Sequence, residues 1–434
     1  MKTRRKSNVR TALLAASCFL VTTTAVFGQT SFIWTNQADS GTGSQIGVAA
    51  NWNPNGVPNP NSDVGAPGDV LQFDGRTTGS LFIDADGSLM GGSSAGVVGV
   101  VVYLDANQVS PMSLYYQTTT DGGFNGTSLR TSNVQVDSGA GQLSIGDTNQ
   151  DAAIYMVFGG TSGQIHTFVN NSAHPVICYP GWRIAMGGGG AHTFDFSGTG
   201  NWYVTNSLEP NNSGSATIIQ LDGPGTMIWQ YASLPSANLS LQPNSLQGPV
   251  TINGGTMIDE SGNLLSQVGA GSQNMLNNGV FIYSGQTNAL NSVANGTISL
   301  GISGSGPIQV TSGALTLSGN NTYVGSNILS GGELIAGSVE TANPSGPLGE
   351  AGLNSISFQG GVLGYSAFNG FDYSPRFDTS SGQQYQIDTA SANVTYSTGL
   401  TSSGGSLTKL GGGSLTLAGA DTYSGLTHVS GGKL

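Results

Sequence analysis

The sequence predicts an all-β protein built as a parallel β-helix, and three observations carry this prediction. Glycine accounts for 69 of the 434 residues, and only 8% of the residues are charged. Short runs of Val, Ile, Leu, Phe and Tyr are separated by Ser, Thr, Asn and Gly, which is the pattern of short strands joined by tight turns. A strand–turn–strand rhythm also returns along the chain, as it does in repeat architectures.

The N-terminal segment differs in composition from the rest of the chain. "MKTRRKSNVR" places five basic residues ahead of the apolar run "TALLAASCFLVTTTAVF". We expect residues 1–28 to be a secretory signal peptide that is cleaved between Gly28 and Gln29. A lipoprotein signal at Cys18 is the alternative, but the leucine usually found three residues before such a cysteine is absent.

Removal of this segment leaves six basic residues against 23 acidic ones, a net charge of −17. A nucleic-acid binder needs clustered cations to neutralise phosphates, and the six lie far apart. We therefore expect no nucleic-acid partner and no attraction to an anionic membrane. These six are Arg76, Arg130, Arg183, Arg376, Lys409 and Lys433.

Cysteine usage adds one expectation. Cys178 is the only cysteine left after removal of residues 1–28, so the exported chain has no internal disulfide. Its place in the apolar run "PVICY" predicts a small buried hydrophobic residue.

Two segments far apart in the chain show the repeat clearly. "GALTLSGNNTYVGSNILSGGEL" (313–334) and "GSLTLAGADTYSGLTHVSGGKL" (413–434) are identical at 12 of 22 positions. Each predicts a strand with alternating leucines, a turn around a tyrosine, a second strand over 327–329 or 427–429, and a third strand that starts at the final leucine. One such unit is a single coil of a β-solenoid.

Coils of this size bury their apolar residues only by stacking, at about 4.8 Å spacing. The shift that superimposes the two segments also aligns Gln309 with Lys409. We expect coils of ~20–25 residues, with weaker copies of the rhythm at 142–160, 191–206, 248–265 and 356–365. The predicted structural positions of the repeat are Leu315, Leu317, Tyr323, Leu334, Leu415, Leu417, Tyr423, Val429 and Leu434.

The last segment, "GGSLTKLGGGSLTLAGADTYSGLTHVSGGKL" (404–434), resembles the autotransporter-associated β-strand repeat, also called the passenger-associated transport repeat. The Leu-Thr-Lys, Leu-Thr-Leu and Thr-Tyr elements follow the family pattern in order. Asp421 replaces its usual asparagine, and Leu426 stands where a glycine is common. A second match covers 304–338.

The resemblance implies a right-handed parallel β-helix of the pectin lyase-like type. It also implies a non-enzymatic passenger-type protein, secreted or on the cell surface, that acts as a structural or adhesive scaffold and supports its own secretion by folding coil by coil. Expected partners are surface glycans or other cell-surface proteins. Membrane contact is expected only through the export machinery or a missing C-terminal anchor.

Three regions follow from these observations. Residues 1–28 are the signal peptide, 29–90 an N-terminal cap or leader, and 91–434 the parallel β-helix, whose array we expect to be truncated at the C-terminus. The stretch 32–75 is similar to the opening of large exported repeat proteins. We expect Trp34 and Trp52 to cap the first coil, because an uncovered sheet edge invites aggregation.

No catalytic, cofactor or metal site is predicted. Asp84 and Asp86 lie on one face of a strand, but a solvated strand end explains them. The stretch "DTNQDA" (147–152) begins like a calcium loop and lacks the following glycine and the closing glutamate. The four histidines, which share no metal-ligand spacing, are His166, His174, His192 and His428.

A glycan-binding or polysaccharide-degrading β-helix is the alternative function. It requires exposed aromatic residues along a groove, and burial of these rings inside the coils would remove its main support. The candidates are Trp182, Trp202, Tyr203 and Trp229.

Overall fold

The structure is a computed structural model of the 434-residue chain. It describes residues 31–34, 44–45, 52–53, 70–75, 79–83, 100–116, 131–146, 154–158, 163, 165–179, 182–186, 192–204, 217–230, 249–260, 274–285, 295–340, 345–350, 352 and 354–434.

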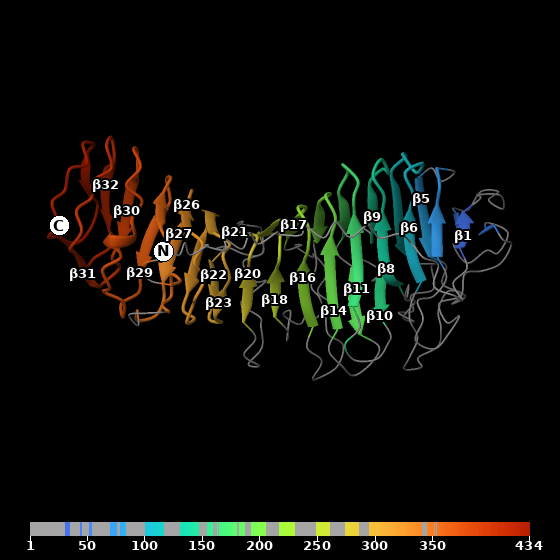
Figure 1. Ribbon diagram of the computed structural model, residues 1–434, viewed down its shortest axis with the longest axis horizontal. Coiled ribbons are helices and arrows are strands. Elements are labelled where there is room, and N and C mark those ends of the chain that lie inside the picture. Colours follow the sequence, from blue (N-terminus) through green and yellow to red (C-terminus); the bar gives the residue numbers. More distant parts are fainter. Residues whose placement is uncertain are drawn as a thin grey trace, which may run out of the picture.

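The described chain is a rod of stacked strands. Figure 1 shows the strands side by side along the long axis, in sequence order from β1 at one end to β32 near the other. The described residues include one short 3₁₀ turn, η2 (Ser374–Arg376). No helix in this part of the chain is long and apolar enough to cross a membrane.

Two long sheets form the main faces of the rod. The first has eleven strands, which are, in spatial order, β23 (Ile302–Ser303), β20 (Met275–Asn277), β18 (Val250–Ile252), β16 (Thr217–Leu221), β14 (His192–Ser197), β11 (Ile165–Asn170), β8 (Thr131–Val136), β6 (Val100–Leu104), β4 (Val70–Phe73), β1 (Ser31–Trp34) and β3 (Trp52–Asn53). The second has twelve, which are β2 (Ser44–Gln45), β5 (Gly79–Ile83), β7 (Met112–Tyr116), β9 (Leu143–Ile145), β12 (Val176–Cys178), β15 (Trp202–Val204), β17 (Thr226–Trp229), β19 (Thr256–Asp259), β21 (Val280–Ser284), β24 (Ile308–Ser312), β26 (Asn327–Leu329) and β28 (Ile356–Phe358).

Three smaller sheets complete the described coils. A seven-stranded sheet contains β22 (Asn295–Ile298), β25 (Ala314–Leu317), β27 (Glu333–Ala336), β29 (Val362–Tyr365), β30 (Gln384–Asp388), β32 (Ser406–Leu410) and β34 (Thr427–Val429). The other two are strand pairs, β10 (Ile154–Phe158) with β13 (Trp182–Met186), and β31 (Asn393–Tyr396) with β33 (Ser414–Leu417).

Parallel pairing between successive coils defines the architecture. Phe168 on β11 is in register with Phe196 on β14, and Phe196 is in register with Leu221 on β16. The pairing of β1 with β3 is antiparallel and sets Trp34 opposite Trp52. All other strand pairs between described strands are parallel, so the prediction of an all-β protein with stacked parallel strands is confirmed.

The coils differ in length more than the repeat predicts. Ile308 pairs with Asn327 on the next coil, whereas Val134 pairs with Phe168, a step that is almost twice as long. The strands keep their register while the connecting segments vary. This variation in the length of the connecting segments explains why the repeat in the sequence is regular only in the last third of the chain.

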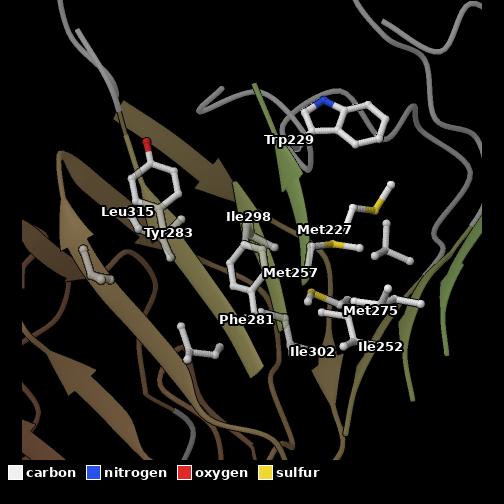
Figure 2. Close-up of a cluster of buried hydrophobic side chains, with 14 of the residues drawn as sticks. Met227, Trp229, Ile252, Met257, Met275, Phe281, Tyr283, Ile298, Ile302 and Leu315 are labelled. Carbon is white, nitrogen blue, oxygen red and sulfur yellow. The ribbon is translucent and has the colours of Figure 1, made fainter. Parts of the chain in front are cut away.

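Inward side chains form continuous apolar columns along the rod. Met227, Met257 and Phe281 are in register on successive strands of the second sheet, and all three are fully buried (Figure 2). Burial of each such side chain contributes roughly 1.5–3 kcal/mol of transfer free energy, and a single coil cannot obtain it alone.

Glycine is required where one coil turns directly over the next. Gly198 has a φ of +97°, and a Cβ there would overlap the carbonyl oxygen of Asn170 on the preceding coil. Both the backbone conformation and the close approach exclude a side chain at this corner.

Parallel stacking is present on both sides of residue 91. Strand β4 pairs with β1 before it and with β6 after it, in both cases in parallel. The division into a cap over 29–90 and a helix over 91–434 remains a prediction from the sequence.

Candidate functional site

The first clear repeat lies on strands β25 to β27 and is packed inside the rod. Leu315, Leu317, Tyr323 and Leu334 are buried, each with at most 1% of its surface exposed. Leu315 and Leu334 are in register on β25 and β27, so each leucine packs on the next coil.

The second repeat lies at the last described coil and is more open. Leu415 is buried, and Leu417 and Tyr423 pack partly buried against the core. Val429 and Leu434 are 45% and 48% exposed. Strand β34 stands at the end of its sheet and pairs there with β32, which leaves its outer side uncovered in the described chain.

The repeat tyrosine fixes the turn between two strands. Tyr323 donates a 2.6 Å hydrogen bond to Oδ1 of Asn327, and Nδ2 of Asn327 donates to the carbonyl oxygen of Leu348. In the second repeat, the hydroxyls of Tyr423 and Thr427 make the same contact at 2.5 Å. The tyrosine therefore ties the start of the second strand to the turn before it.

The lysine of the second repeat lies inside the rod. Lys409 is fully buried, and its Nζ donates to the carbonyl oxygens of Leu410 (2.5 Å), Gly411 (3.1 Å) and Gly431 (3.3 Å). Burial lowers the pKa of this amine, and the Asp388 carboxylate opposes that shift. The lysine side chain thus links the glycine turns at Gly411 and Gly431 by hydrogen bonds.

The alignment of Gln309 with Lys409 is wrong by one residue. Lys409 faces inward on β32, whereas Gln309 is half-buried on β24 between the inward Ile308 and Val310. The carbonyl oxygens of Val310 and Lys409 accept equivalent bonds from the amides of Ser330 and Ser430. The turn before Leu415 holds one residue more than the turn before Leu315, which displaces the match.

A buried charged cluster lies beside the first repeat. Tyr373 donates a 2.7 Å hydrogen bond to Oε2 of Glu340, and the Arg376 guanidinium lies over the Tyr373 ring, 5.4 Å from its centroid. Nη2 of Arg376 donates to the carbonyl oxygen of Leu348 and to Oδ1 of Asn354. Burial raises the pKa of Glu340, while the Tyr373 hydroxyl and the Arg376 charge limit the rise.

This cluster was not predicted from the sequence. Glu340, Tyr373 and Arg376 belong to no motif and lie on two connecting segments of different coils. Arg376 was the one indication in the sequence. It is an isolated basic residue in a chain with few basic residues, which suggests looking for an acidic partner.

The histidines divide into a buried pair and two residues on the surface. Nε2 of His166 and Nδ1 of His192 lie 3.1 Å apart across β11 and β14, and both rings are buried. The His166 ring also stacks on Phe194, with centroids 5.4 Å apart. Burial lowers the pKa of His192. His174 and His428 are exposed.

The candidate glycan-stacking rings are largely inside the rod. Trp202 and Trp229 are each 1% exposed, and Trp202 packs edge-on against Phe168 and Phe196. Tyr203 is half-buried. Trp182 lies on β13, outside the residues whose side chains are described. Burial of the two tryptophans leaves them unavailable to a ligand on the surface, which weakens the support for a glycan-binding groove.

One outward carboxylate has a perturbed ionisation. Burial raises the pKa of Asp195 on β14 to about 6, and the nearby charge of Asp222 adds to the rise. Asp222 itself accepts hydrogen bonds from Gln220 and Asn253, both 2.7 Å long. The described part of the chain contains no group of three or more His, Cys, Asp or Glu residues placed to hold a metal ion.

Cys178 is buried on β12, and burial raises the pKa of its thiol. Several predicted features lie outside the described residues, namely the cleavage position at Gly28 and Gln29, the pair Asp84 and Asp86, and the stretch 147–152. The backbone places Trp34 opposite Trp52, and their side chains are outside the description.

The described coils are thus stacked on one another, and buried polar side chains hydrogen-bond to their turns and connecting segments. Comparison with known proteins agrees with this picture. The family described as passenger-associated-transport-repeat matches residues 312–336 and 407–434. These two segments hold β25 to β27 and β32 to β34.

A curated protein is similar over a longer stretch. The "Adhesin BmaC autotransporter" of Brucella suis biovar 1 (strain 1330) is 28% identical over 275 residues, which cover 56% of this chain and 8% of that adhesin. The chain thus spans a small part of the adhesin's length, and no solved structure matches. The resemblance predicted from the sequence is confirmed: the chain carries two passenger-associated transport repeats.

Proposed function

We propose that this chain is the rod of an exported passenger-type surface protein and that it acts as a non-enzymatic adhesive scaffold. The observation that carries the proposal is the coincidence of the two matched repeats with coils of a parallel solenoid. Similarity to a protein named as an adhesin and autotransporter supports the same role.

The proposed partners are cell-surface proteins. Burial of Trp202 and Trp229, the two tryptophans whose side chains the structure describes, makes these large planar rings unavailable for stacking on sugars, which favours protein over glycan ligands. The acidic chain also favours ligands that do not depend on anionic groups, since like charges repel.

An adhesion assay tests this role. Beads coated with residues 29–434 are incubated with cultured cells, and bound beads are counted before and after protease treatment or enzymatic deglycosylation of the cells. We expect binding that protease abolishes and deglycosylation spares. Loss of binding on deglycosylation would favour the glycan alternative, and binding no greater than that of albumin-coated beads would refute adhesion.

Export forms the second part of the proposal. The signal peptide over 1–28 is expected to direct the chain out of the cytoplasm, to the cell surface or the medium, and N-terminal sequencing of the exported chain should begin at Gln29. Retention of residues 1–28 on the exported protein would contradict this.

We further propose that coil-wise folding supports secretion. Each coil contacts mainly its neighbours, so a folded coil templates the next one. Variants that weaken the coil of Tyr323 should slow the appearance of the chain outside the cell in proportion to their loss of stability. Unchanged secretion by clearly destabilised variants would contradict this.

A further inference from the structure

The outward face of the second sheet carries a continuous column of apolar side chains. Five residues on successive strands β12, β15, β17, β19 and β21 are in direct register. We call this column the apolar strip; its members are Ile177, Tyr203, Ile228, Ile258 and Ile282.

The strip lies on the outside of the rod. Along β17, Met227 and Trp229 are buried in the core (Figure 2). Ile228 lies between them in the strand, so the strand alternation sends its side chain to the opposite face. The same alternation holds along the other four strands, and every member of the strip is half-buried.

Strand geometry does not demand apolar residues here. On the first sheet, the corresponding outward column of the same five coils is polar at four positions, Thr167, Asp195, Gln220 and Thr251, and its fifth member is Leu276. Five consecutive apolar outward positions on one sheet, beside a column with four polar members out of five on the other, indicate a surface that something covers.

The borders of the strip carry little charge. On one side lie Thr226, Thr256 and Val280, which are in register with one another. On the other side Gln230 donates a 2.8 Å hydrogen bond to the Glu260 carboxylate. Two acidic chains therefore meet little repulsion if they approach along this face, and a strongly basic partner finds little to pair with.

We propose that a second copy of this chain covers the apolar strip, so that two rods pack side by side along their second sheets. The spacing supports this partner. Side chains along the strip repeat every ~4.8 Å, and another stacked parallel sheet has the same repeat, so that residues of one copy fit between residues of the other. The proposal does not depend on the adhesive role.

The size of the strip sets the strength of the contact. Five coils at ~4.8 Å and a width of about 10 Å give roughly 240 Å² per copy, well below the ~800 Å² per partner of a stable dimer. The contact should therefore be weak, so that dimers form only at high protein concentration.

Sedimentation equilibrium of the chain 29–434 tests the proposal. The wild type should show reversible dimers whose fraction rises with concentration, and the Ile228→Glu/Ile258→Glu variant should weaken self-association at least tenfold. The matched control is Ile218→Glu/Thr251→Glu, which adds the same charges to outward positions of the first sheet in the same coils. Its self-association should change less than threefold.

Cysteine cross-linking gives a second readout that survives poor folding of the charged variant. Ile228 is the middle member of the strip, so either two-fold arrangement of the rods brings the two Ile228 positions together. Under mild oxidation, Ile228→Cys should form disulfide-linked dimers at least tenfold faster than Ile218→Cys. The buried native Cys178 is common to both variants.

The outcomes are distinct. A wild type that stays monomeric up to about 1 mM, where even a contact of a few hundred Å² is measurable, overturns the proposal. Equal weakening by both charged pairs, or equal cross-linking by both cysteines, overturns it as well. Binding of wild-type chain to neutral lipid vesicles without self-association assigns the strip to another partner.

Discussion

The phenol of Tyr323 donates a 2.6 Å hydrogen bond to the side chain of Asn327, and neither residue has any surface exposed to solvent. The bond closes the turn between the two strands of the repeat coil. Asn327 also donates to Leu348 on the connecting segment of the same coil, so the tyrosine anchors a longer loop through one shared residue.

Loss of that hydroxyl should destabilise the coil. Tyr323→Phe leaves the buried Oδ1 of Asn327 without its donor, at a cost of about 1–3 kcal/mol. Tyr423→Phe is the matched control: its partner Thr427 is exposed, so water replaces the lost bond and the cost should be below about 0.5 kcal/mol. Urea unfolding of both variants measures the difference, and equal losses would contradict the assignment.

Substitutions at two glycines can distinguish the cost of backbone strain from the cost of a steric clash. Gly198 and Gly163 have φ values of +97° and +89°. A methyl group at Gly198 would overlap the backbone of the preceding coil, whereas one at Gly163 would meet no described atom within 4 Å. Gly163→Ala should therefore cost about 1–2 kcal/mol through its positive φ alone. Gly198→Ala should cost several-fold more, because the methyl group meets the Asn170 carbonyl and parts two coils. Thermal melting compares them, and similar losses would contradict the packing argument.

The Asp195 carboxyl should make the rod more stable in acid. Its folded pKa of about 6 lies above the ordinary value of 3.8, so the folded state binds the proton more tightly. Stability from this group is therefore complete below pH 4 and is lost as the pH rises through 6. Asp195→Asn should raise stability by about 1–2 kcal/mol at pH 7.5, after allowance for solvent screening, and leave it unchanged at pH 4.

Asp137→Asn provides the contrast for that experiment. Asp137 accepts hydrogen bonds from Tyr103 (2.6 Å) and Gln135 (2.9 Å), so removal of its charge weakens both at neutral pH. The two variants should shift the melting temperature at pH 7.5 in opposite directions. A stabilising Asp137→Asn would show that general charge reduction, and not the local environment of Asp195, is responsible.

The Glu340 and Arg376 charges should depend on each other. Arg376→Met removes the positive charge that acts on the Glu340 carboxylate and the hydrogen bonds to Leu348 and Asn354, and should cost about 1–3 kcal/mol. The pKa of Glu340 is already raised, and it rises further without Arg376, so the loss should grow from pH 5 to pH 8. Glu340→Gln/Arg376→Met should recover part of the stability at pH 8. Denaturant unfolding at both pH values tests this, and a pH-independent loss would contradict the coupling.

The regular part of the fold was predictable because its information is local. The second strands expected at 327–329 and 427–429 are β26 and β34, since alternating leucines, a tyrosine turn and a double glycine all lie within one coil. The error at Gln309 arose where a single extra residue in a turn breaks a fixed shift between the two repeats.

The less predictable features depend on registers between coils of unequal length. Ile177 and Ile228 lie two coils apart and are linked in register through Tyr203, and no fixed period in the sequence connects them. Glu340 and Arg376 lie on connecting segments of different coils and are linked through Tyr373, which contacts both. Such contacts follow from the strand pairing, which becomes visible only after the coils are stacked.

The parallel pairing of successive coils also determines how the rod responds to mechanical force. Hydrogen bonds between coils run along the long axis, so a pull between the two ends loads one coil boundary at a time and peels the rod from an end. The coil step from Ile308 to Asn327 would release roughly 65 Å of extended chain, and that from Val134 to Phe168 would release roughly 115 Å. The rod is thus an extensible tether that yields in unequal steps, and the lengths of its connecting segments set how much slack each step provides.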